Sequence, residues 1–182
     1  MNDKTEALLG KRQIRDNVER FVKDVHEGIR RDHGYRARLR RALSPAQEPM
    51  IWGNLTRYMD ISRSTDRAMF ALVGASIALE DAGTPGTLGL GATLRACGPD
   101  KALDDKSDPQ VARLRRILRC NSGDELAAVL KPVLALIRSR HPGRLDYARL
   151  LDELLSFDKV PEIIKAKWVS DFYRKNSEEE GK

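Results

Sequence analysis

The chain of 182 residues has few aromatic residues, only two cysteines and no long apolar run. Aromatic residues make up 5% of the chain, so its core must consist mainly of aliphatic side chains. Cys97 and Cys120 are isolated, which predicts buried thiols without a disulfide. No segment approaches the roughly 18 apolar residues of a membrane span, and the opening MNDKTEALLGKR lacks the apolar core of a secretory signal. We therefore expect a cytoplasmic protein without a membrane partner.

Motifs of catalytic and cofactor sites are also missing. The histidines at 26, 33 and 141 lack the company of an HExxH, HxxxH or CxxC motif. The glycine-rich stretch 83–91 matches neither GxGxxG after a strand nor a P-loop, and we expect a flexible loop there. No GxSxG motif occurs, and no cysteine and histidine share a known catalytic spacing. The sequence predicts no catalytic residues, no metal, no cofactor and no enzymatic activity.

Two pairs of neighbouring acids could suggest a magnesium site. Asp104 and Asp105 lie in a polar segment, and no partner acid stands at a recognisable spacing. The helical pattern around Asp152 and Glu153 places both on the outer face of an amphipathic helix. We expect solvated carboxylates at both places.

Helical periodicity dominates the chain, and no convincing strand pair occurs. It predicts an all-α fold of two small helical bundles, residues 1–98 and 108–175, joined by a short polar linker and followed by an acidic tail, 176–182. Helices are expected at about 11–31, 35–43, 49–59, 64–81, 91–97, 109–120, 122–140, 145–157 and 160–174.

Several features mark the ends and the centre of these helices. Asp108 before Pro109 and the capping-box spacing of Ser122 and Glu125 open two helices of the second half. AMFALVGASIAL is apolar nearly all round, which is typical of a buried helix and predicts the central helix of the first half. The aromatic residues stand at packing positions in helices, so we expect core anchors at Trp52, Tyr58, Trp168, Phe172 and Tyr173.

The positive charge is carried by arginine in two segments. The net charge is +6, from 33 basic and 27 acidic residues. Six arginines and only one acid lie between Ile29 and Leu43, and eight basic residues face two acids between Val111 and Arg144. The candidate nucleic-acid-binding residues are Arg36, Arg38, Arg40, Arg41, Arg113, Arg115, Arg116, Arg119, Lys131, Arg138, Arg140 and Arg144.

This imbalance favours a binding surface over an ordinary solvated helix face. Solvated faces usually mix both signs of charge at pairing distance. The planar guanidinium fork suits phosphate oxygens, and unbalanced arginine clusters are typical of nucleic-acid patches. Because the aromatic residues are expected in the core, no base-stacking platform remains. The pattern predicts a protein that reads the nucleic-acid backbone and its shape rather than its sequence.

Several segments together resemble a known family. RARLRRALS, ALVGASIALED, TLGLGATLRA, RLRRILRCNSGDELAAVLKPVLALIRS, LDYARLLDELLSF and AKWVSDFYR, in this order, are similar to the CasB small subunit of the type I-E CRISPR surveillance complex, Cascade. The basic positions of that family are matched best by Arg38, Arg41, Arg113, Arg116 and Arg119.

The resemblance implies a two-bundle helical protein that is present as a homodimer inside Cascade. It implies as partners the guide RNA, target and single-stranded DNA, and the backbone and large subunits of the complex. Such a subunit braces the guide RNA–target DNA duplex and holds the displaced strand, without nuclease activity. A stand-alone helical DNA-binding regulator and a pure protein scaffold, whose arginines meet acidic proteins, remain as alternatives.

Overall fold

The structure is a computed structural model that describes residues 3–80, 85–98 and 107–174, with side chains from Arg12 onward. Within these residues it is all-α, without a β-strand, as the sequence predicts. The first helices are α1 (Asp3–Arg31), α2 (His33–Arg41), the 3-10 helix η1 (Glu48–Ile51), α3 (Trp52–Leu55), α4 (Ser64–Leu79) and α5 (Leu90–Ala96). The later ones are α6 (Pro109–Leu118), α7 (Gly123–Arg140), α8 (Tyr147–Ser156) and α9 (Pro161–Tyr173).

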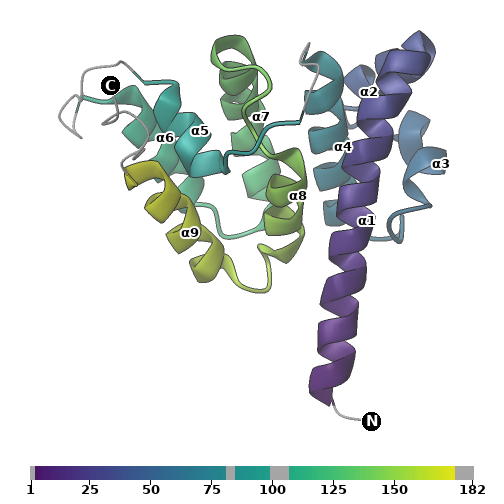
Figure 1. Ribbon diagram of the computed structural model, residues 1–182, viewed down its shortest axis with the longest axis horizontal. Coiled ribbons are helices and arrows are strands. Elements are labelled where there is room, and N and C mark those ends of the chain that lie inside the picture. The colour runs from purple at the N-terminus through teal and green to yellow at the C-terminus, as the bar shows by residue number, and fades with distance from the viewer. Residues whose placement is uncertain (1–2, 81–84, 99–106, 175–182) are drawn as a thin grey trace.

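Helix α4 lies between the first helices of the chain and the pair α7 and α8 (Figure 1). It contacts α1 and α2 on one side and α7 and α8 on the other. Every residue from Met69 to Ala78 is buried, because the segment is apolar nearly all round. One continuous apolar core therefore runs through the protein, from Val18 in α1 to Phe172 in α9. The predicted burial of this helix is confirmed, but the helix packs against both halves of the chain rather than the first half alone.

Helix α5 packs with the second half of the chain. It contacts α9 most extensively and also α6 and α7, and Figure 1 shows it among them. At Gly91 a Cβ atom would overlap the backbone oxygen of Trp168, so only glycine allows this approach of α5 to α9. Helix α5, which the sequence analysis assigned to the first bundle, therefore contacts helices of the second half of the chain. Most of the expected linker, with Asp104 and Asp105, and the tail 176–182 lie outside the described residues.

The helix starts of the second half follow from their caps. The side chain of Asp108 accepts from the backbone N–H of Gln110 at 2.7 Å. Ser122 Oγ accepts from the backbone N–H of Glu125 at 3.3 Å, and the Glu125 carboxylate accepts from the backbone N–H of Asn121 at 2.9 Å. This is a capping box whose return bond is displaced by one residue.

Two predicted helices differ from the structure. The helix expected at 11–31 begins at Asp3. The helix expected at 49–59 is instead the short 3-10 helix η1 followed by the single turn α3. Gly53 and Thr56 are poor helix formers, so a long helix is not stable there.

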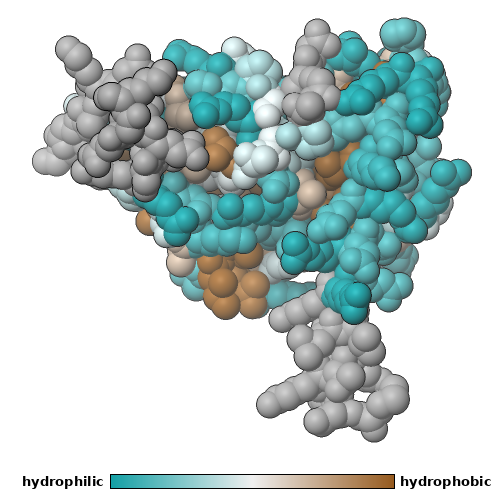
Figure 2. Space-filling view, in the orientation of Figure 1, coloured by the Kyte–Doolittle hydropathy of each residue, from teal (hydrophilic) through white to brown (hydrophobic). Residues whose placement is uncertain are grey.

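Figure 2 shows that the surface over α1 is largely hydrophilic, whereas hydrophobic atoms gather at the lower end of α9. The exposed apolar residues at that end are Val160 and Ile163, the latter 66% exposed.

Candidate nucleic-acid interface

The predicted basic residues lie on a continuous row of packed helices. Helix α2 contacts α4, α4 contacts α7, and α7 contacts α6. The ammonium group of Lys131 in α7 donates to the backbone oxygen of Leu43, just after α2, at 3.0 Å. The two arginine segments, far apart in the sequence, are therefore carried by neighbouring helices.

Some of these residues stabilise the C-terminal end of α4. Arg36 and Arg40 each donate from Nε to the backbone oxygen of Ala78, at 3.0 and 2.8 Å. Arg138 donates to the hydroxyl of Ser76 at 3.2 Å. Cations suit this end because the last carbonyl groups of a helix lack partners and carry partial negative charge. Arg36, Arg40 and Arg138 thus serve the fold through at least part of their donors.

Arg38 and Arg113 interact with residues that lie in their own helices or next to them. Arg38 lies 3.4 Å from the Asp32 carboxylate, with its guanidinium 5.9 Å from the centre of the Tyr35 ring. Arg113 donates to the backbone oxygen of Pro109 at 3.1 Å and to the side chain of Gln110 at 3.3 Å. Both side chains are half-buried.

The remaining predicted arginines are exposed, and no hydrogen bond or ion pair joins their guanidinium groups to other residues of the described ranges. We call them the open arginines: Arg41, Arg115, Arg116, Arg119, Arg140 and Arg144. In α6 the apolar residues Val111, Leu114 and Ile117 face the core, so Arg115 and Arg116 face outward. Helix α6 contains no acidic residue.

Helices α6 and α7 bring basic groups together at the end of α5. Burial raises the pKa of the Cys97 thiol, and the charges of Arg140 and Arg113 oppose this shift. Both guanidinium groups therefore influence the same thiol. His141 lies beside them, with Nε2 2.7 Å from the backbone oxygen of Ala96. The sequence did not predict that these basic groups come together, because α5 packs against residues far from it in the chain.

The acid predicted on the outer face of α8 is in fact buried. Glu153 accepts from the Trp168 indole at 2.6 Å and from Arg149 at 2.9 Å, and pairs with Lys167 at 2.7 Å. The expectation of a solvated carboxylate is wrong for this residue, because α9 covers this side of α8. Asp152 is half-buried, and burial raises the pKa of its carboxyl against the opposing charge of Arg15. The signal that was missed is the buried tryptophan, whose N–H needs an acceptor.

The aromatic residues divide between core and surface. Trp168, Phe172 and Tyr58 are buried, which confirms those anchors, whereas Trp52 is only half-buried. Tyr173 is 51% exposed, so its prediction as a core anchor is wrong. It stands in the last turn of α9, and its ring meets that of Phe172 edge-on at 5.0 Å between centroids.

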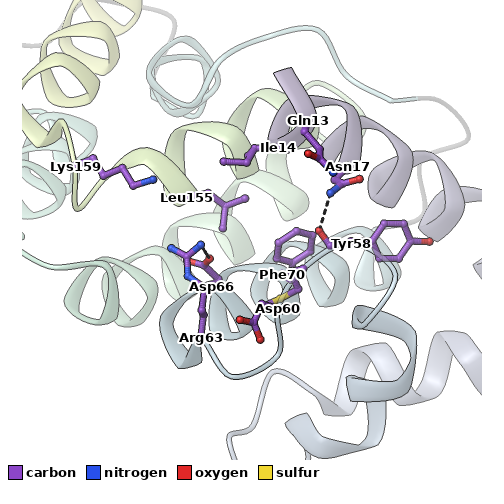
Figure 3. A pocket seen from close by; sticks show the side chains of 11 residues that line it. Gln13, Ile14, Asn17, Tyr58, Asp60, Arg63, Asp66, Phe70, Leu155 and Lys159 are labelled. Atoms are coloured by element: carbon purple, nitrogen blue, oxygen red, sulfur yellow. Dashed lines mark hydrogen bonds and ion pairs between the residues drawn. The ribbon is translucent and has the colours of Figure 1, made fainter. Parts of the chain in front are cut away.

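A cavity of about 340 Å³ lies between α1, α4 and the end of α8 (Figure 3). Ile14, Phe70 and Leu155 provide its apolar lining. Its half-buried acid Asp66 pairs with Arg63 at 3.1 Å, and burial raises the pKa of that carboxyl. Neither histidine nor cysteine lines this cavity. Across the described ranges no group of three or more histidine, cysteine or acidic side chains could hold a metal ion, and no helix there could cross a membrane.

The fold and the open arginines define a small all-helical protein with a basic surface supported by other basic side chains. Residues 35–173 match the family described as CRISPR-associated protein Cse2. The chain belongs to this family, which confirms the resemblance found in the sequence.

Similar proteins agree with this assignment. A CRISPR-associated protein Cse2 from Thermus thermophilus is 30% identical over 122 residues, which cover 66% of this chain and 64% of that protein. The crystal structure of CasB from Thermus thermophilus has a TM-score of 0.65 at 25% identity, covering 86% of this chain and 97% of CasB. A chain of a CRISPR RNA-guided surveillance complex has a TM-score of 0.66 at 27% identity, covering 88% and 93%.

Proposed function

We propose that the protein is a non-catalytic subunit of a cytoplasmic CRISPR surveillance complex that binds nucleic-acid backbone. In this role it braces the guide RNA–target DNA duplex and holds the displaced DNA strand. The observation that carries the proposal is the set of open arginines on α6 and at the end of α7, which are exposed and have no carboxylate partner in the described residues. Family membership supports the same setting, because one similar chain is part of a CRISPR RNA-guided surveillance complex.

The open arginines suit phosphate for a chemical reason. Each guanidinium offers planar pairs of N–H donors that match phosphate oxygens, and its charge displaces counterions from the strand. The half-buried residues Arg38 and Arg113 contribute their remaining donors beside them. Arg36, Arg40, Lys131 and Arg138 hold the helices that carry the row together, while their charges add to the same field. Such contacts position a strand without reading its bases.

The partners in this proposal are guide RNA, the target DNA with its displaced strand, the backbone and large subunits of the complex, and a second copy of this chain. The same proposal holds that the protein has no catalytic groups. Any nuclease or ATPase activity found in a preparation should therefore disappear on repurification. Activity that persists and is abolished by a chelator would contradict the proposal.

A binding experiment separates this function from the alternatives. The purified protein is mixed at low salt with fluorescent single-stranded DNAs of unrelated sequence, and fluorescence anisotropy is measured. We expect all of them to bind with similar affinity. No binding would favour a pure protein scaffold, and strong preference for one duplex sequence would favour a stand-alone regulator. Co-purification of a tagged chain with other subunits and RNA tests the place in the complex.

A further inference from the structure

A loop at the end of α7 presents two of the open arginines. Arg140 is the last residue of α7, and Arg144 lies four positions later, in the loop 141–146 that leads to α8. Both side chains are exposed and have no hydrogen-bond or ion-pair partner among the residues that the structure describes. The backbone beneath them, in contrast, is fixed by residues from three other parts of the chain.

The strongest restraint comes from Glu80, directly after α4. Its carboxylate accepts a hydrogen bond from the backbone N–H of Gly143 at 2.9 Å. Gly143 has a φ of 75°, the only positive φ in the described residues, and this left-handed conformation suits glycine. Glu80 therefore holds the loop at the one position where its backbone turns sharply.

The other restraints hold both sides of the turn. The Leu88 N–H donates to the backbone oxygen of Arg144 at 2.9 Å, and the Asp146 N–H donates to the backbone oxygen of Leu88 at 2.8 Å. On the other side, the His141 ring bonds the backbone oxygen of Ala96 at 2.7 Å. The turn is thus enclosed by the segment around Leu88 and the end of α5.

Glu80 is only 5% exposed. A buried carboxylate is costly unless its hydrogen bonds and neighbouring charges compensate. Burial raises the pKa of this group, while the Gly143 N–H and the charge of Arg138 oppose the shift. The hydrogen bond that Glu80 accepts from the loop explains why an acid occupies this buried position.

We propose that Glu80 is a positioning residue that fixes the loop 141–146 so that Arg140 and Arg144 together bind the phosphates of a nucleic-acid strand. This inference rests on the proposed function. A loop already ordered before binding loses little conformational entropy when the strand arrives, so its arginines bind more tightly than they would on a mobile loop. The part of Glu80 that matters is the acceptor oxygen, not the negative charge.

Charge and positioning predict opposite results for one substitution. Glu80→Ala removes a negative charge, which by charge alone strengthens binding to phosphate. Positioning predicts instead that the full-length variant binds single-stranded DNA about fivefold more weakly, because the loop must then be ordered during binding. Glu80→Gln keeps an acceptor for the Gly143 N–H and should bind as well as the wild type. Glu162→Ala, at an exposed acid on α9, is the matched control for charge and should not weaken binding.

The test is the affinity of each purified variant for single-stranded DNA at several salt concentrations, with circular dichroism to verify folding. The double variant Arg140→Ala, Arg144→Ala should weaken binding, and adding Glu80→Ala to it should cause no further loss. Unchanged affinity in Glu80→Ala, equal losses in Glu80→Ala and Glu80→Gln, or an additive loss in the triple variant would overturn the positioning role. If the double variant binds like the wild type, the loop does not contact nucleic acid, and the proposed function loses this part of its surface.

Discussion

Glu153 of α8 accepts a hydrogen bond from the indole N–H of Trp168 of α9 at 2.6 Å, and both side chains are buried. A buried indole N–H is costly without an acceptor, and a buried carboxylate is costly without cations. Arg149 and Lys167 supply these cations from α8 and α9. One acid therefore joins the last two helices and satisfies the largest buried side chain of the second half.

Trp168→Ala should unfold or strongly destabilise the second half. Removing a large buried aromatic side chain costs roughly 3–5 kcal/mol of unfolding free energy. Trp168→Phe keeps much of the ring volume but loses the donor to Glu153, so its cost should be smaller, about 1–3 kcal/mol. Urea unfolding followed by circular dichroism measures both. An alanine variant with an unchanged midpoint would show that this tryptophan is not a core anchor.

Gly91→Ala should destabilise the protein, because its methyl group would overlap the backbone oxygen of Trp168 and force α5 away from α9. The expected loss is at least about 1–3 kcal/mol, as in other overpacked sites. Gly53→Ala in α3 is the matched control, since its added methyl group would meet nothing within 4 Å apart from the helix's own backbone and the neighbouring residues in the chain. It should be neutral or slightly stabilising. Equal melting temperatures for the two variants would contradict the close packing of α5 and α9.

Much of this fold could be predicted from local sequence, because local contacts determine it. The helix beginning at Pro109 follows from the cap at Asp108, and the buried centre of α4 follows from an apolar run. The position of α5 could not be predicted, since it depends on Gly91 meeting a backbone oxygen of α9, far away in the chain. The burial of Glu153 could not be predicted either, because the pattern of α8 places this residue on the outer face of the helix, and only the packing of α9 covers it.

Only part of the candidate site could be predicted from the sequence, for a similar reason. Composition identified the two arginine segments, and in the second of them the structure leaves Arg115, Arg116 and Arg119 exposed. Composition could not separate these from Arg36 and Arg40, because their shared acceptor, the backbone oxygen of Ala78, is a tertiary contact. A sequence shows which side chains could bind phosphate, but not which of them the fold already uses.

Arg36→Ala should lower stability more than an exposed arginine does. It removes the donors to the backbone oxygens of Ala78 and Glu80 at the end of α4. Loss of such a charged hydrogen bond costs about 1.5 kcal/mol. Arg115→Ala, which breaks no such bond, should change the unfolding free energy by less than about 0.5 kcal/mol. Thermal unfolding of both variants checks this, and equal losses would remove the distinction between bonded and open arginines.

Glu80→Gln should change stability in a pH-dependent way. Because burial raises the pKa of Glu80 above its ordinary value of 4.5, its charged form destabilises the fold at neutral pH. As the pH falls through the raised pKa towards 4.5, the folded state takes up the proton first and this cost disappears. The variant should therefore melt above the wild type near pH 8, with a difference that shrinks towards pH 4.5. A difference independent of pH would contradict the burial of a charged Glu80.

The most direct test of the central claim is a salt titration of single-stranded DNA binding for the wild type and Arg116→Ala, Arg119→Ala. Each phosphate contact contributes roughly 0.7 to the slope of log affinity against log salt for single strands. The double variant should therefore have a slope smaller by about one unit and weaker binding to every sequence, with unchanged helix content. Lysine at both positions should lose less, because the charge remains while the planar fork is lost.

The control variant Arg15→Ala, Arg31→Ala loses the same amount of positive charge. It is suitable because these arginines already pair with Glu19 and Glu27 on α1. It should leave the slope nearly unchanged. A slope and an affinity equal to the wild type in Arg116→Ala, Arg119→Ala, or an equal fall in both double variants, would contradict a phosphate-binding surface on α6.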